Sequence, residues 1–152
     1  MSRLEMAQPA DKMGVREGDR LFLVNAPTPS LEAIDLPPVT VPVRLTGCFD
    51  HIIVFVRREA DLVRQCSRLR GHLEPTGRLW IAWPKKGRLP TNLDIKSVIR
   101  IGYNCGLVES TTLRIDDTWT ALKFTWPKPG KRYNNKYGTL PETPHPRAPR
   151  SG

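Results

Sequence analysis

Five candidate ligand-binding residues lie at or just after the ends of two predicted strands: Asn25, Pro27, Trp83, Lys85 and Lys86. The asparagine offers a donor and an acceptor, the tryptophan a flat ring, and the lysines cationic donors. Ligands of open α/β sheets bind at the carboxyl ends of parallel strands, so these residues predict a site for an anionic or planar ligand. The alternative is structural: the asparagine ends its strand, the tryptophan packs and the lysines are solvated.

Basic and aromatic residues also alternate near the C-terminus, and the set consists of Lys128, Lys131, Arg132, Tyr133 and Lys136. Cationic side chains pair with phosphates, and aromatic rings stack on bases. This composition predicts contact with RNA or with an acidic protein surface. The alternative is a solvated segment that contacts no partner.

The other candidates for chemistry favour structural roles. Asp116 and Asp117 are adjacent, so on a strand their carboxylates would point to opposite faces and would not act on one atom. His51, His72 and His145 have no metal-ligand spacing. The sequence contains no Gly-x-Ser-x-Gly motif, phosphate-binding Walker loop or His-Glu-x-x-His motif. We therefore expect no catalytic residue, no bound metal and no cofactor.

Positive charge is concentrated in residues 127–152, which we name the C-terminal segment. The whole chain of 152 residues carries a formal net charge of +9. The C-terminal segment has six basic residues against one glutamate and six of the fifteen prolines. With few aliphatic side chains it cannot offset its ordering entropy, so we expect it to be mobile when free. Residues 1–12 are predicted as a shorter N-terminal extension, which leaves 13–126 as the folded domain.

The sequence favours a cytoplasmic protein with no membrane partner. Its longest apolar run, 52–56, is five residues, against about twenty needed to cross a bilayer. The first twenty residues contain no apolar run typical of a signal peptide. Three cysteines without a Cys-x-x-Cys pair argue against a disulfide framework. Nothing in the sequence indicates an oligomeric state.

Strands and helices are predicted to alternate along residues 13–126. Runs of β-branched and apolar residues predict strands at 21–24, 39–45, 52–56, 78–83, 107–115 and 119–126. Stripes of apolar residues predict helices at 30–35, at 59–73 and from a Thr91 or Asn92 cap to about Cys105. Pro42 limits its strand to an edge, residues 75–77 predict a turn, and 116–118 predict a hairpin turn.

This order of elements predicts an α/β fold with a small, mainly parallel sheet and a C-terminal antiparallel hairpin. The runs 52–56 and 79–83 are continuous and apolar, as in strands that are covered on both faces. We therefore expect them to be adjacent central strands, flanked by 21–24.

Two resemblances support this fold. Phe49-Asp50 before a buried strand, followed by a helix and Leu73-Glu74-Pro75-Thr76-Gly77-Arg78-Leu79, resembles the second half of Rossmann-like methyltransferases. The stretch 12–124 is also similar to bacterial domain-of-unknown-function family 3052. That resemblance rests on the blocks Lys12-Met13-Gly14-Val15, Val24-Asn25-Ala26-Pro27, Phe49-Asp50, Leu79-Trp80-Ile81-Ala82-Trp83-Pro84-Lys85-Lys86, Gly106-Leu107-Val108 and Asp116-Asp117-Thr118-Trp119-Thr120-Ala121-Leu122-Lys123-Phe124. It implies an incomplete, methyltransferase-like fold and brings no known activity.

The methyltransferase resemblance implies a site for S-adenosylmethionine, and two departures bear on it. Such enzymes place a glycine-rich turn after the first strand and an acidic residue at the end of the second strand, which holds the ribose. Here the turn reads Asn25-Ala26-Pro27-Thr28-Pro29, and the second candidate strand ends in Thr46-Gly47. The departures favour a non-catalytic binding or interaction module. The alternatives are an S-adenosylmethionine-dependent methyltransferase with a non-standard cofactor site and a small-molecule sensor.

Overall fold

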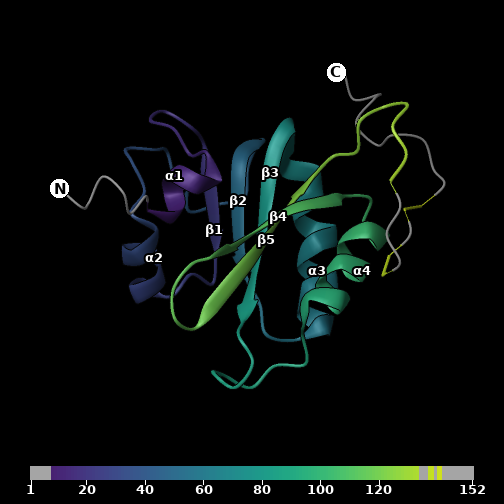
Figure 1. Cartoon of the computed structure of the whole chain (residues 1–152). Coiled ribbons are helices and arrows are strands. Elements are labelled where there is room, and N and C mark those ends of the chain that lie inside the picture. Colours follow the sequence, from purple (N-terminus) through teal and green to yellow (C-terminus); the bar gives the residue numbers. More distant parts are fainter. Residues whose placement is uncertain (1–7, 134–136, 139, 142–152) are drawn as a thin grey trace.

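A computed structural model describes residues 8–133, 137–138 and 140–141. Helices cover both faces of one sheet, with α1 and α2 on one side and α3 and α4 on the other (Figure 1). No helix in this described part is long and apolar enough to cross a membrane. The elements are α1 (Pro9–Met13), β1 (Leu21–Val24), α2 (Thr28–Ile34), β2 (Phe49–Phe55), α3 (Glu59–Leu69), the 3-10 helix η2 (Arg70–His72), β3 (Leu73–Pro84), α4 (Ile95–Asn104), β4 (Val108–Arg114) and β5 (Trp119–Thr125).

The strand order in the sheet is β1-β2-β3-β5-β4. Strands β1, β2 and β3 pair in parallel, whereas β5 is antiparallel to both β3 and β4. The predicted fold class is therefore confirmed, including the closing antiparallel hairpin. The prediction that β2 and β3 are neighbouring parallel strands flanked by β1 is also confirmed.

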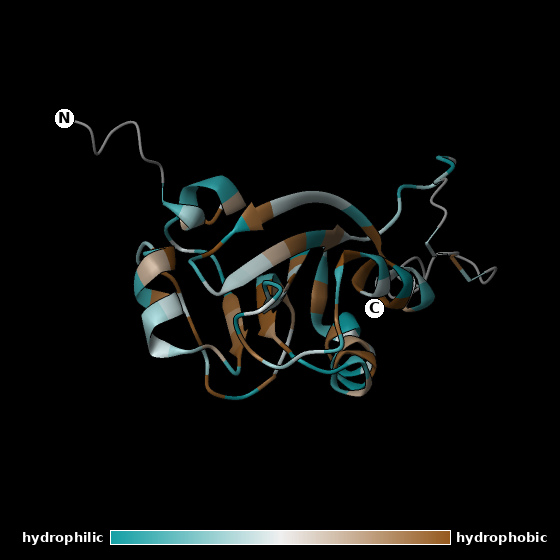
Figure 2. Cartoon of the chain, turned by 60° about the horizontal axis from the view of Figure 1, so that its bottom comes forward, coloured by the Kyte–Doolittle hydropathy of each residue, from teal (hydrophilic) through white to brown (hydrophobic). Residues whose placement is uncertain are grey.

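The two faces of the sheet bury separate apolar clusters because successive side chains of a strand point to opposite faces. Ile81 belongs to the cluster under α3 and α4, whereas Ile53 and Phe55 belong to the cluster on the other face, together with Met13 of α1. Figure 2 shows brown, hydrophobic segments in the strands between the helices, whereas the hairpin of β4 and β5 also has pale and teal segments. The expected cover on both faces of the runs 52–56 and 79–83 is confirmed, since Ile53, Phe55 and Ile81 are each no more than 2% exposed.

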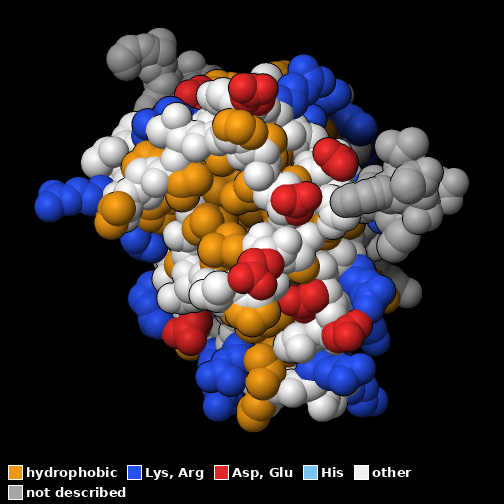
Figure 3. Space-filling view, turned by 90° about the vertical axis from the view of Figure 1, so that its left-hand side faces the viewer, with side chains coloured by type: hydrophobic (Ala, Val, Ile, Leu, Met, Phe, Trp, Pro, Cys, Tyr) orange, Lys and Arg blue, Asp and Glu red, His pale blue; other side chains and the backbone are white. Residues whose placement is uncertain are grey.

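The predicted edge strand at 39–45 is wrong. It is reduced to a single parallel bridge between Thr40 and Arg20. Pro42 lacks an N–H for pairing, and Val43 is 95% exposed. The side chain of Arg20 instead donates to the carbonyl oxygens of Thr46 and Cys48, at 2.6 and 3.0 Å. Strand β1 is therefore the edge of the sheet, and hydrophobic side chains gather on this side of the molecule (Figure 3).

The predicted turn at 75–77 is also wrong, because β3 begins earlier, at Leu73. Phe49 pairs with Leu73 and His51 pairs with Arg78, so the extra residues of β3 form a bulge. A Cβ atom on Gly77 would lie 2.9 Å from the carbonyl oxygen of Phe49. The glycine therefore permits the close approach of the two strands and does not mark a turn.

Both ends of the folded domain extend into neighbouring residues. Helix α1 begins at Pro9, inside the predicted extension 1–12, and buries Ala10 and Met13 against the sheet. Three residues of the C-terminal segment are partly buried against the cluster under α3 and α4: Tyr133, Tyr137 and Leu140. The mobility of the whole segment stays a prediction, and residues 142–152 lie outside the described residues.

A buried histidine gives the fold an expected pH dependence. His51 of β2 is 3% exposed, and its Nε2 lies 3.0 Å from Oδ2 of Asp19. Burial lowers the pKa of His51 below its ordinary value of 6.5, although Asp19 acts in the opposite direction. Below about pH 6.5 the unfolded chain therefore binds more protons at this residue than the folded protein does. The free energy of unfolding is consequently higher above this pH and decreases as the pH falls.

We expect the free energy of unfolding to fall between about pH 7 and pH 5, by at most about 1.4 kcal/mol per pH unit from this group. Urea unfolding of the wild type and of His51→Gln at both pH values measures this contribution. The variant should lose less stability than the wild type on acidification. Equal losses would show that His51 does not carry the effect.

Candidate functional site

The residues predicted to hold a ligand at the carboxyl ends of the strands are divided between two places. Trp83, Lys85 and Lys86 line a pocket of about 820 Å³ formed mainly by the loop between β3 and α4, which we name the loop pocket. Asn25 and Pro27 follow β1, two strands away, and do not line it. The structure therefore brings three of the five residues together.

The loop between β3 and α4 closes the carboxyl end of β2. Thr91 Oγ1 donates to the carbonyl oxygen of Arg57 at 2.7 Å, and the backbone N–H of Asn92 donates to the same oxygen at 3.3 Å. The side-chain oxygen of Asn92 accepts from the N–H of Glu59, the first residue of α3, at 2.8 Å. These bonds occupy backbone groups at the carboxyl end of β2, where ligands of open α/β sheets bind.

Helix α4 is therefore not capped by Thr91 or Asn92 as predicted. It begins after Asp94, whose side chain accepts from the N–H of Ser97 at 2.9 Å, while Oγ of Ser97 accepts from the N–H of Asp94 at 3.0 Å. This is a reciprocal capping box. The hydrogen bond from the Ser97 backbone lowers the pKa of Asp94.

The turn after β1 does not form a cradle for a cofactor. Asn25 has a φ of 57°, Pro27 is the N-cap of α2 and Pro29 lies in the first turn of that helix. The two prolines supply no N–H groups, and Ala26 keeps a Cβ where close approach needs glycine. On the side of β1 away from β2, the described chain forms only the bridge between Thr40 and Arg20, so no strand there carries an acidic residue for a ribose. These residues do not fit S-adenosylmethionine held as the resemblance implies.

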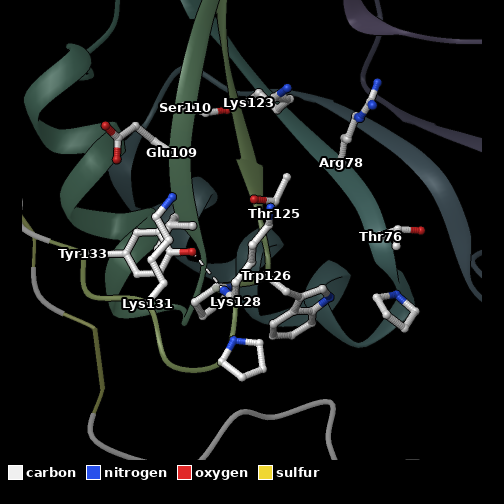
Figure 4. A pocket seen from close by; sticks show the side chains of 14 residues that line it. Thr76, Arg78, Glu109, Ser110, Lys123, Thr125, Trp126, Lys128, Lys131 and Tyr133 are labelled. Carbon is white, nitrogen blue, oxygen red and sulfur yellow. Dashed lines mark hydrogen bonds between the residues drawn. The ribbon is translucent and has the colours of Figure 1, made fainter.

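A second pocket, of about 850 Å³, lies at the opposite end of β3 (Figure 4). Arg78 of β3 and Lys123 of β5 line it from the sheet, and Lys128 and Lys131 line it from the C-terminal segment. We name it the cationic pocket. Glu109 is the one acidic residue of its lining.

The chemistry of the cationic pocket favours an anion. Its carboxylate, Glu109, accepts a hydrogen bond from the Tyr103 hydroxyl at 2.8 Å. Burial and this carboxylate raise the pKa of Tyr103. Burial and the charge of Arg78 lower the pKa of Lys123. Within the described part of the chain, neither Arg78 nor Lys123 forms an ion pair. A bound anion would offset the unfavourable proximity of these two charges.

The residues predicted near the C-terminus lie partly in this pocket. Lys128, Lys131 and Tyr133 line it, and the Tyr133 hydroxyl accepts from the Lys128 N–H at 2.9 Å. Nζ of Lys131 lies 5.3 Å from the centroid of the Tyr133 ring. Arg132 is exposed but does not line the pocket, and Lys136 lies outside the described residues.

Sequence reasoning missed Arg78 and Lys123 as site residues. Lys123 interrupts the apolar run of β5 at a position between two buried residues, Leu122 and Phe124. A cation inside such a run was a signal that one face of β5 is open to solvent.

The carboxylates at the hairpin have structural partners. Asp116 accepts from the N–H groups of Thr118 and Trp119, at 2.9 and 2.8 Å, and from Oγ of Ser30 at 2.7 Å. It therefore fixes the turn and ties α2 to the hairpin. In the described ranges, no cluster of three or more His, Cys, Asp or Glu residues could hold a metal ion.

Comparison with solved structures identifies the same fold in methyltransferases. A ribosomal-protein methylase from Lactobacillus delbrueckii matches with a TM-score of 0.51 at 10% identity, over 79% of this chain and 76% of the other. Magnesium protoporphyrin IX methyltransferase from Synechocystis matches with a TM-score of 0.51 at 12% identity, over 73% and 75%. A TehB-like methyltransferase from Corynebacterium glutamicum matches with a TM-score of 0.50 at 11% identity, over 80% and 89%.

These likenesses show a methyltransferase-like Rossmann fold. At such low sequence identity they are evidence for the fold and not for the activity. No protein-family model matches the sequence, and no curated protein is significantly similar to it. Membership in domain-of-unknown-function family 3052 therefore stays a prediction.

Proposed function

We propose that this protein is a non-catalytic binding module on a methyltransferase-like sheet, and that its basic C-terminal segment engages RNA or an acidic protein surface. The observation that carries this proposal is the cationic pocket. There Lys128 and Lys131 of the segment meet Arg78 and Lys123 of the sheet around one hollow. A basic concavity of this kind concentrates anionic partners by electrostatic attraction.

The carboxyl edge of the sheet supports the non-catalytic part of the proposal. The turn after β1 contains prolines in place of glycines, and the loop through Thr91 and Asn92 occupies the end of β2. A cytoplasmic location is part of the same proposal, because all three cysteines are free thiols.

The loop pocket supports two alternatives, a methyltransferase with a non-standard cofactor site and a small-molecule sensor. It contains Trp83, Lys85 and Lys86 at the carboxyl end of β3, where open α/β sheets bind ligands. Trp83 is only 5% exposed, however, so its ring serves mainly the core.

Isothermal titration with S-adenosylmethionine separates the binding module from the methyltransferase. We expect no binding tighter than a Kd of about 100 μM, which corresponds to roughly −5.5 kcal/mol. Tighter binding would overturn the non-catalytic proposal and assign the loop pocket to the cofactor if Trp83→Phe weakened it. In the same buffer, the protein should bind a polyanion with an affinity that falls as salt is raised.

A further inference from the structure

Two cations of the cationic pocket come from neighbouring strands and share one face of the sheet. Lys123 pairs in register with Trp80, two residues along β3 from Arg78. Residues two apart on a strand point to the same face, so Arg78 and Lys123 lie on the face that carries Trp80. Arg78 donates through Nη1 to the carbonyl oxygen of Met13 at 2.7 Å, which anchors its guanidinium and leaves further donors for a ligand.

Flat apolar rings line the same pocket beside these cations. Trp126 is 6% exposed, its Nε1 donates to the carbonyl oxygen of Leu73 at 3.3 Å and the guanidinium carbon of Arg70 lies 5.5 Å from its ring centroid. Its ring therefore serves mainly the core, as that of Trp83 does. Tyr133 is held by the N–H of Lys128. Pro127 and Pro129 complete this part of the lining (Figure 4). The ring of Tyr133 is partly exposed, so it gives a base a surface to pack on without an ordering cost at the moment of binding.

We propose that the cationic pocket binds single-stranded nucleic acid, with a backbone phosphate held by Arg78 and Lys123 and a flanking base against the ring of Tyr133. This inference rests on the proposed function and names its partner class. The pocket volume of about 850 Å³ is within the roughly 300–1,000 Å³ of pockets that enclose small ligands. The pocket therefore holds a short part of a nucleic-acid strand, while the exposed Lys128 and Lys131 contact the phosphates on either side.

The lining favours nucleic acid over an acidic peptide. Carboxylates would use the four cations but not the partly exposed ring of Tyr133. Hydroxyl groups also line the pocket, from Thr76, Ser110 and Thr125. A single strand presents phosphates, bases and sugar hydroxyls, and so matches cations, rings and hydroxyls together.

Fluorescence anisotropy with an unstructured uridine-rich RNA of about 12 nucleotides tests the inference, using the full chain at several salt concentrations. Lys123→Met removes the cation and keeps the length of the side chain. Loss of one phosphate contact on a single strand should weaken binding about fivefold at 0.1 M salt and reduce the log–log salt slope by about 0.7. Arg64→Gln is the matched control, since Arg64 is exposed on α3 and carries the same charge. It should leave affinity and slope unchanged.

The outcomes separate this inference from the function on which it rests. If Lys123→Met binds RNA with wild-type affinity and slope, the pocket is not the site, although the C-terminal segment can still engage RNA. If poly-glutamate binds as tightly as RNA and is weakened equally by Lys123→Met, the partner is an acidic protein and the nucleic-acid assignment fails. If the wild type binds neither polymer, the proposed function itself fails. A thermal melt of Lys123→Met monitored by circular dichroism should show the wild-type transition, which excludes loss of folding as the cause.

Discussion

Replacement of Ile81 by alanine is expected to lower the free energy of unfolding by about 2–5 kcal/mol. Ile81 is fully buried in the middle of β3, between Val54 of β2 and Leu122 of β5, and faces the cluster under α3 and α4. The alanine would remove apolar contacts and leave a cavity that strands paired on both sides cannot collapse to fill.

Denaturant unfolding of Ile81→Ala and of Val43→Ala measures this difference. Val43 is almost fully exposed after the single bridge of Thr40, so its truncation should change the stability by no more than about 0.5 kcal/mol. A folded Ile81→Ala protein that loses less than about 1 kcal/mol would contradict the central position of β3.

Ile81 also illustrates which parts of the fold the sequence predicts. A continuous apolar run must be covered on both faces, so β2 and β3 could be placed in the centre of the sheet without a structure. The hairpin followed from the turn residues, because Asp116 satisfies the N–H groups of its own turn. In each case the deciding interaction is local or depends on the apolar pattern alone.

The errors arise where distant residues decide the local structure. The alternation in 39–45 is typical of a strand, but Arg20 fixes the chain that follows it through two carbonyl oxygens. Thr91 and Asn92 are good capping residues, yet they bond to the turn after β2 instead. Gly77 sits beside the backbone of Phe49. Each of these contacts joins segments that lie far apart in sequence, so no local pattern contains it.

The candidate site shows the same division. The basic residues near the C-terminus were visible from composition, because a density of cations and aromatic rings needs no pairing information. Arg78 and Lys123 are 45 residues apart in sequence, and only the antiparallel pairing of β3 with β5 brings them to one pocket. The sequence predicts the loop pocket at the end of β3, but Asn25 and Pro27 lie two strands away because β2 separates β1 from β3.

Neutralising the C-terminal cations should have the largest effect on function. The triple variant Lys128→Gln, Lys131→Gln and Arg132→Gln is expected to bind single-stranded RNA about 100-fold more weakly than the wild type at 0.1 M salt. Three lost phosphate contacts on a single strand, at about 0.7 each, should also reduce the log–log salt slope by about 2. All three side chains are exposed, so the melting temperature should change little. Substitution is preferable to truncation, because Tyr133, Tyr137 and Leu140 pack on the core.

A control with the same total charge distinguishes a local site from general attraction. The variant Arg64→Gln, Arg68→Gln and Arg114→Gln also lowers the formal charge from +9 to +6, but these arginines are exposed on α3 and β4, outside the C-terminal segment. Exposed charges more than about 10 Å apart are largely screened at 0.1 M salt. We therefore expect the control to stay within about twofold of the wild type. Equal weakening by both triple variants would mean that RNA responds to net charge alone, and the C-terminal segment would then have no special part in binding.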